Sequence, residues 1–211
     1  MNSVLHGFLP SILAGMLVTL AVALTSLVIA LVLGLLGAAA KLSRRRFLAS
    51  LAAVYTTVIR GVPDLVLMLL IFYGGQMAIN ALAPHFGYED YVDINPFIAG
   101  VLTIGFIFGA YLTETFRAAL MAIPAGQREA GLAYGLSRAQ VFVRITLPQM
   151  VRFALPGFTN NWLVLVKSTA LVSVIGLSDM LQRAGLAAGA TREPFTFYVT
   201  VALLYLLITS V

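Results

Sequence analysis

Long apolar stretches alternate with short polar segments along the whole chain. Stretches with few or no charged residues cover about 9–40, 50–82, 94–117, 152–177 and 194–211. A helix needs about 20 largely apolar residues to cross a bilayer. The stretches are continuous rather than alternating, which favours helices over the strands of a β-barrel. The sequence therefore predicts an all-α membrane protein with five transmembrane helices, forming a single domain over 1–211.

The segments between these stretches differ in charge, and the difference predicts an orientation. The first holds Lys41, Arg44, Arg45 and Arg46, and the third holds Arg117, Arg128, Arg138, Arg144 and Arg152. The second holds Glu89, Asp90 and Asp93 without Lys or Arg, and the fourth holds Arg183 and Arg192 beside Asp179 and Glu193. Because basic loops stay in the cytoplasm, we expect the N-terminus outside and the C-terminus inside. No Lys or Arg precedes the first stretch, which favours an uncleaved, reverse-oriented anchor over a signal peptide.

Composition excludes several classes of protein. The chain is 61% hydrophobic and 10% charged, whereas an ordinary soluble domain is about 25% charged. A soluble enzyme and a disordered chain are therefore both excluded. There is no cysteine, and His6 and His85 lie too far apart to form a metal site. The net charge of +5 follows from the basic loops, so we expect no nucleic-acid partner.

The segment around 120–150 predicts a helix–turn–helix at the membrane face. Pro124 suits a helix start, Gly135 suits a helix end, and Ser137 can cap a second helix. Ala130 and Gly131 would expose backbone to a close partner, and Glu129 could accept hydrogen bonds from it. Docking of another protein and resting on lipid headgroups fit these features equally well.

The spacing of this segment resembles the EAA loop of ABC importer permeases. The resemblance lies in Glu129, Ala130, Gly131, Gly135, Ile145, Leu147 and Pro148. One position departs from the pattern, because the family usually has Ala where this chain has Gly131. The resemblance implies that these seven residues form the coupling helix, which sits in a groove of an ATPase subunit and transmits its closure to the membrane helices.

Other segments resemble the polar-amino-acid branch of these permeases, in particular permeases for histidine, lysine, arginine, ornithine and opines. They are 60–64, 111–117, 155–162, 167–171 and 190–195. The resemblance implies a type I importer permease in the bacterial inner membrane, in complex with a homologous sister permease, two ABC ATPase subunits and a periplasmic amino-acid-binding protein. The substrate would be a basic amino acid, with glutamine or glutamate as the alternative. The family continues past the fifth helix into a basic tail, whereas this sequence stops at Val211, which leaves either a truncated helix or one without that anchor.

The chain has no G-x-x-x-x-G-K-[ST] phosphate loop. We therefore expect no cofactor in this chain, with ATP and Mg²⁺ held by the partner ATPase, and no catalytic residue or enzymatic activity of its own.

Charged residues inside the apolar stretches cost about 2.5–3.5 kcal/mol each on insertion scales, so each needs an explanation. Arg60 and Asp64 lie four residues apart and could pair on one helix face, in a helix that bends at 61–63. Glu114 and Arg117 could pair three residues apart near a helix end. The alternative for Asp64 and Glu114 is a place in the substrate pathway, where Glu114 would attract a cationic side chain. Gly105 and Gly109 predict close helix packing.

The fourth apolar stretch carries a run of polar residues. Asn160 and Asn161 are followed by Lys167, Ser168 and Thr169. Polar groups in lipid must find partners, so hydrogen bonds between helices are the default, and substrate contact is the alternative. Lys167 could neutralise a substrate carboxylate or pair with Asp64 or Glu114. The neutral Asn161 and Ser168 favour a sister permease that supplies the carboxylates.

Two other functions would demand features that the sequence lacks. A secondary transporter needs an inverted repeat or ion-coordinating acids at mid-membrane, and five spans divide poorly into two repeats. An intramembrane enzyme needs a nucleophile–base pair or a metal cluster.

Overall fold

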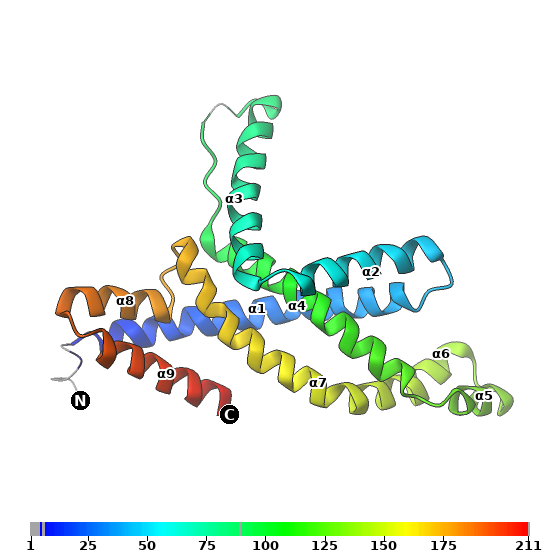
Figure 1. Ribbon diagram of the computed structural model, residues 1–211. Helices are drawn as coiled ribbons and strands as arrows, with labels where there is room; N and C mark the ends of the chain where they lie inside the picture. The colour runs from blue at the N-terminus through cyan, green and yellow to red at the C-terminus, as the bar shows by residue number, and fades with distance from the viewer. Residues whose placement is uncertain (1–4, 6, 89, 211) are drawn as a thin grey trace. The chain divides into compact units, whose positions relative to one another are not determined.

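The computed structural model describes residue 5, residues 7–88 and residues 90–210. His6, Glu89 and Val211, which figure in the sequence analysis, lie outside the described residues. Every regular element of the described chain is a helix (Figure 1). In chain order they are α1 (Leu9–Lys41), α2 (Arg46–Gly61), α3 (Asp64–Leu82), η1 (Ala83–Phe86), α4 (Pro96–Met121), α5 (Ala125–Ala133), α6 (Arg138–Val141), η2 (Phe142–Thr146), α7 (Leu147–Ser168), η3 (Thr169–Ile175), α8 (Met180–Thr191) and α9 (Pro194–Ser210).

Four helical segments of the described chain are long and apolar enough to cross a membrane. They are Leu9–Lys41, Asp64–Phe86, Pro96–Met121 and Arg138–Ile175. The fifth apolar helix, α9, has 17 residues and is therefore about 25 Å long.

The apolar stretch predicted over 50–82 is divided into two helices, which corrects the expectation of one continuous span. α2 ends at Gly61 and α3 begins at Asp64. Pro63 lacks a backbone N–H and disfavours a helical conformation at the residue before it, and its own backbone is extended, with φ −56° and ψ 135°. Arg60 and Asp64 consequently belong to different helices, so the expected pair on one helix face is wrong.

The fourth predicted span begins earlier than expected because the helix continues from the preceding loop. α6 runs into a π-helical segment, η2, in which the Leu147 N–H donates to the carbonyl of Phe142. α7 follows directly and contains Pro156. It gives way at Thr169 to a 3₁₀ segment.

The helices group into two compact units, each built from several pieces of the chain. Unit 1 consists of Met1–Ile29, Val62–Phe106 and Leu163–Val211, and unit 2 consists of Ala30–Gly61 and Ile107–Trp162. α1, α4 and α7 each contribute one part to unit 1 and another to unit 2.

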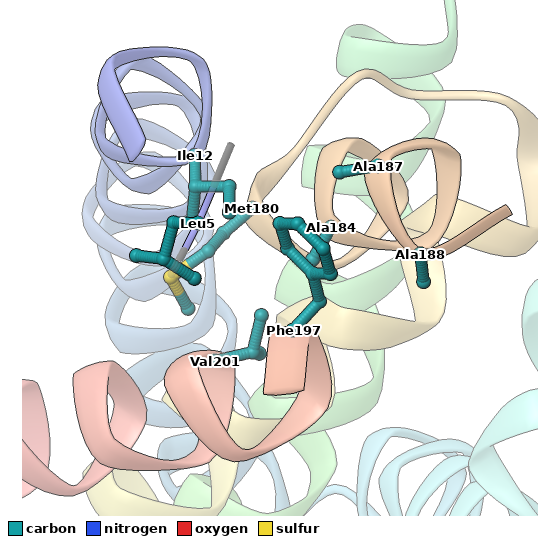
Figure 2. Packing of buried hydrophobic residues seen from close by; sticks show 8 residues of the cluster. All are labelled: Leu5, Ile12, Met180, Ala184, Ala187, Ala188, Phe197 and Val201. Atoms are coloured by element: carbon teal, nitrogen blue, oxygen red, sulfur yellow. The ribbon is translucent and has the colours of Figure 1, made fainter. Parts of the chain in front are cut away.

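The core of unit 1 forms where the first turns of α1 meet α8 and α9. Ile12, Met180 and Phe197 are fully buried there, in one cluster with small alanines of α8 (Figure 2). The small side chains let the helices approach closely. At Gly15 a Cβ atom would lie 2.8 Å from the carbonyl oxygen of Asp179, so only glycine fits this crossing.

Unit 2 is held by the close approach of α1 to α4. A Cβ atom on Gly34 would lie 2.7 Å from Leu112 Cβ, and one on Gly109 would lie 2.7 Å from Leu33 Cβ. The tight packing predicted for Gly109 is therefore present. In unit 1 Gly105 is equally tight, because its Cβ would lie 2.7 Å from Ile29 Cβ.

Asp179 caps the start of α8 from a fully buried position. Its Oδ1 accepts a hydrogen bond of 2.8 Å from the Gln182 N–H, and no side-chain surface is exposed. Burial raises the pKa of this carboxyl from 3.8 to about 6, although backbone hydrogen bonds oppose the shift.

The raised pKa predicts a pH-dependent stability. Between about pH 4 and pH 6 the folded protein binds more protons at Asp179 than the unfolded chain does, so stability falls as the pH rises through this window. Asp179→Asn keeps a capping oxygen and removes the charge. We expect it to raise the free energy of unfolding at pH 7.5 by about 1–3 kcal/mol and to have little effect at pH 4. The check is the melting temperature in detergent at both pH values.

Asp93→Asn is the matched control, because Asp93 is exposed. An equal gain for Asp179→Asn at both pH values would show that this carboxyl does not titrate in the window.

Candidate functional site

The loop around 120–150 forms the helix–turn–helix that the sequence predicts. Pro124 occupies the position before α5 with an extended backbone, φ −57° and ψ 133°. At the other end Gly135 is left-handed, with φ +83°. The Leu136 N–H donates to the carbonyl of Gly131 at 3.1 Å, and the Gly135 N–H donates to the carbonyl of Leu132 at 3.0 Å. These two bonds form a Schellman motif, which satisfies the last carbonyls of a helix.

The second helix of the loop has an equally well-defined start. The Ser137 Oγ accepts a hydrogen bond of 3.3 Å from the Gln140 N–H, and the Gln140 Oε1 accepts one of 2.8 Å from the Ser137 N–H. This reciprocal pair is a capping box. The cap expected at Ser137 is therefore confirmed, and it fixes where the chain turns from α5 into α6 (Figure 1).

The seven residues of the EAA-like pattern divide into a surface set and a packing set. Glu129, Ala130, Gly135 and Pro148 are exposed. Ile145 and Leu147 are half-buried.

Gly131 is buried in this loop, so the expectation that it exposes backbone to a partner is wrong. A Cβ atom there would lie 2.6 Å from Ile145 Cδ1 and 3.0 Å from Val141 Cγ2. Gly131 thus lets α5 lie directly against the π-helical start of the long helical segment. The sequence signal was present, since a small residue can serve either an outer or an inner contact, but spacing along the chain does not say which.

Glu114 is held by two basic side chains at the end of α4. It accepts a hydrogen bond from the Lys41 ammonium and lies 3.6 Å from Arg117 Nη1. The predicted pair with Arg117 is confirmed. Spacing along the chain does not indicate Lys41 as a partner, although Lys41 and Glu114 both follow charge-free stretches whose ends the predicted topology brings to the same membrane face. With two cations at its carboxylate, Glu114 already has local partners in the absence of substrate.

Arg60 stacks on an aromatic ring, which accounts for a charge in an apolar stretch. Its guanidinium carbon lies 5.4 Å from the centroid of the Tyr111 ring. A cation over the face of an aromatic ring is attracted by the ring quadrupole.

Asn161 is engaged in the interhelical hydrogen bond that was the default expectation. Its Nδ2 donates to Thr115 Oγ1 at 2.9 Å, joining α7 to α4. One turn earlier on α7, a Cβ atom on Gly157 would lie 2.9 Å from Thr115 Cγ2, so the two helices touch closely here. The neighbouring Asn160 is exposed.

The predicted polar residues of unit 1 differ in their surroundings. Thr169 is fully buried and donates to the carbonyl of Val166 at 2.6 Å, and its hydroxyl also lies 3.4 Å from the Tyr205 hydroxyl. Ser168 is half-buried, and Lys167 is exposed. Among the described residues of unit 1, Lys167 forms no ion pair with the half-buried Asp64.

The seven substrate-pathway candidates are divided between the units. Asp64, Lys167, Ser168 and Thr169 belong to unit 1, and Glu114, Asn160 and Asn161 belong to unit 2. Within the described part of the chain no three His, Asp or Glu side chains come together in a way that could hold a metal ion.

The chain is similar to transport system permease proteins over nearly its full length. It is 53% identical to the histidine/lysine/arginine/ornithine transport system permease protein HisQ of Escherichia coli (strain K12), across 98% of this chain and 90% of the relative. It is 46% identical to the octopine transport system permease protein OccQ of Rhizobium radiobacter, across 92% and 81%. Among solved structures, an amino acid ABC transporter crystallised with histidines has a chain with a TM-score of 0.80 and 31% identity, across 96% of this chain and 89% of that one.

The sequence profile of one family, the binding-protein-dependent transport system inner membrane component, matches residues 30–211. The match includes the whole helix–turn–helix described above. The chain therefore belongs to the family of binding-protein-dependent transport system inner membrane components.

Proposed function

We propose that this chain is the permease subunit of an ATP-driven importer that moves basic amino acids, such as arginine, ornithine, histidine or lysine, from the periplasm to the cytoplasm. The observation that carries the proposal is the helix–turn–helix of α5 and α6, with Glu129 and Ala130 on its surface and Gly131 packed against the start of the long segment behind it. The basic substrate class is supported by the names of the relatives, which carry histidine, lysine, arginine, ornithine and octopine. A permease for glutamine or glutamate is the alternative. The chain itself is not an enzyme, because a partner ATPase hydrolyses the ATP.

The proposed topology has five spans, with the N-terminus in the periplasm and the C-terminus in the cytoplasm of a bacterial inner membrane. The four long apolar segments and α9 would supply the spans. In this topology α5 and α6 lie in the cytoplasm within one multi-pass permease domain, and the acidic loop around 83–95 faces the periplasm.

The partners follow from this arrangement. Two ABC ATPase subunits would supply the groove for α5 and hold the ATP and Mg²⁺, while this chain holds no cofactor. A periplasmic amino-acid-binding protein would deliver the substrate on the opposite face. A homologous sister permease would complete the pathway, and the neutral Asn161 and Ser168 favour a sister that supplies the carboxylates.

The geometry supplies a mechanical link from the ATPase to the membrane. α5 is packed through Gly131 onto Ile145, and Ile145 lies in the π-helical segment that continues into α7. A displacement of α5 by a closing ATPase groove would therefore pull on the start of α7. ATP can drive alternating access only by stabilising one state of the permease more than the other. The contact between Gly131 and Ile145 would transmit this difference in stability from the ATPase to the membrane helices.

The substrate pathway is proposed among the polar residues of the spans. Lys167 and Asn160 are exposed, and Lys167 has no ion pair within the described part of unit 1. They are therefore the best available to meet a carboxylate or an amino group. The proposal also keeps residues that would have to give up a present hydrogen-bond or ion-pair partner, or leave a half-buried position, to contact the substrate. They are Asp64, Glu114, Asn161, Ser168 and Thr169.

Loss of the surface carboxylate tests the coupling role. Glu129→Gln removes the charge from an exposed position without disturbing the packing of α5. We expect uptake to fall by about tenfold or more while membrane insertion is unchanged, because the permease loses coupling energy to the ATPase. Uptake into proteoliposomes made with the full complex is the measurement.

Gln127→Ala is the matched control, an exposed change on the same helix. Normal uptake by the Glu129 variant would remove the coupling assignment.

The packing contact tests the mechanical link separately. Gly131→Ala requires the flexible end of Ile145 to move and the Val141 methyl to shift slightly, and we expect near-normal uptake. Gly131→Leu forces α5 away from Ile145 and Val141, and we expect the ATPase to co-purify while uptake falls by about tenfold or more. Equal uptake by the two variants would show that this contact does not carry the coupling.

Substrate class is tested by ATPase activity of the complex in liposomes. A binding protein loaded with arginine or histidine should stimulate hydrolysis, and one loaded with glutamine should not. Stimulation by the glutamine-loaded form would be consistent with an importer but would overturn the basic substrate class. A complex without ATPase activity would contradict the proposal that the chain belongs to an ATP-driven importer.

A further inference from the structure

A cavity of about 1060 Å³ opens in unit 2 beside the helix–turn–helix. It lies among the ends of α1 and α4, the helix α5, and the start of α6 and η2. Its apolar wall includes Leu42, Leu120, Ile123, Leu132, Val141 and Phe142. A volume of this size is at the upper end of the range that holds small molecules, about 300–1,000 Å³.

The rim of the cavity is strongly basic. Three arginines line it, Arg44, Arg128 and Arg138, against a single carboxylate, Glu129. All four side chains are exposed, and none of them forms an ion pair with another described residue. The cavity therefore offers three free guanidinium groups next to an apolar wall, and the arrangement is complementary to a ligand with an anionic head and an apolar body.

The position of the cavity along the helices matches a lipid boundary. α1 carries an apolar run of 33 residues that ends at Lys41, and α4 ends at Met121. The charge-free run of α4 ends earlier, before Glu114, so the cavity lies just past the apolar runs of both helices. In the proposed topology this is the level of the cytoplasmic headgroups. Guanidinium groups bind phosphate through paired hydrogen bonds and are well suited to this site.

We propose that this cavity binds one anionic phospholipid, with its phosphate between Arg44, Arg128 and Arg138 and one acyl chain along the apolar wall. A glycerol headgroup would also offer hydroxyl donors to Glu129. A zwitterionic lipid fits the net positive rim less well because its ammonium group meets the arginines, and free phosphate lacks the apolar part. The bound lipid would brace α5 against the ends of α1 and α4.

The first test removes the rim charges. Arg44→Gln, Arg128→Gln and Arg138→Gln are combined in one variant, and Arg45→Gln, Arg46→Gln and Arg144→Gln form the control. The control removes the same charge from the same loops, and none of its residues lines the cavity. Both proteins are purified with their partner subunits and titrated with phosphatidylglycerol, phosphatidylcholine and glycerol phosphate, with native mass spectrometry as the readout.

The unchanged protein and the control should retain one phosphatidylglycerol per permease in preference to phosphatidylcholine. The rim variant should bind it at least about tenfold more weakly, because hydrogen bonds to charged groups are lost. Equal affinity of the two triple variants would overturn the proposal, and so would glycerol phosphate binding as tightly as the lipid.

A second measurement does not depend on the folding of the rim variant. Phe142, which lines the cavity, and Phe153, which does not, are each replaced by photoreactive p-benzoylphenylalanine; the two phenylalanines are 49% and 48% exposed. In liposomes of mixed lipids, Phe142→p-benzoylphenylalanine should crosslink phosphatidylglycerol in excess over phosphatidylcholine, and Phe153→p-benzoylphenylalanine should crosslink both in proportion to their amounts. Proportional crosslinking at both positions would contradict the site.

Discussion

The free-energy cost of an unpaired backbone N–H or C=O group in hydrocarbon determines the architecture of this chain. A peptide N–H or C=O in lipid must be paired within the protein, which restricts spanning segments to helices when no barrel is formed. Within the four long apolar segments the backbone is accordingly helical throughout, and it departs from the α-helix only in the 3₁₀ segments η1 and η3 and the π-helical η2. The interruptions at Pro63 and Gly135 lie outside these segments. At Gly135 the freed carbonyls are paired again by the Schellman motif.

The same solvent changes what can hold the helices together. Lipid is as apolar as leucine, so helices gain little from hydrophobic burial alone and associate through close packing and polar contacts. Both are seen in unit 2. Gly34 and Gly109 bring α1 and α4 into contact, and the Lys41–Glu114 pair joins their ends. Asn161 joins α7 to α4 by a hydrogen bond.

The loop between α4 and α7 is determined by local sequence signals rather than by contacts between long helices. A proline before α5, a glycine after it and a serine cap for α6 each act within a few residues, and all three work as the sequence predicts. This local order gives the surface around Glu129 a defined shape. It also places Glu129 at the basic rim of the cavity, so a partner protein and a lipid headgroup would share part of this surface.

The sequence by itself determined the helical class, the approximate spans and both ends of the helix–turn–helix, since length, apolarity and capping residues act locally. It indicated a bend at Gly61, Val62 and Pro63 but not the division into two helices, because a continuous apolar run hides a short interruption. Only the tertiary structure decided that Gly131 faces inward, that Lys41 is the partner of Glu114 and that Asn161 meets Thr115. The long helix α1 is apolar on every side and carries no stripe to mark its inner face. The short helix α5 has several small residues, and its pattern does not show which of them packs inward, so these contacts depend on which helices pack together.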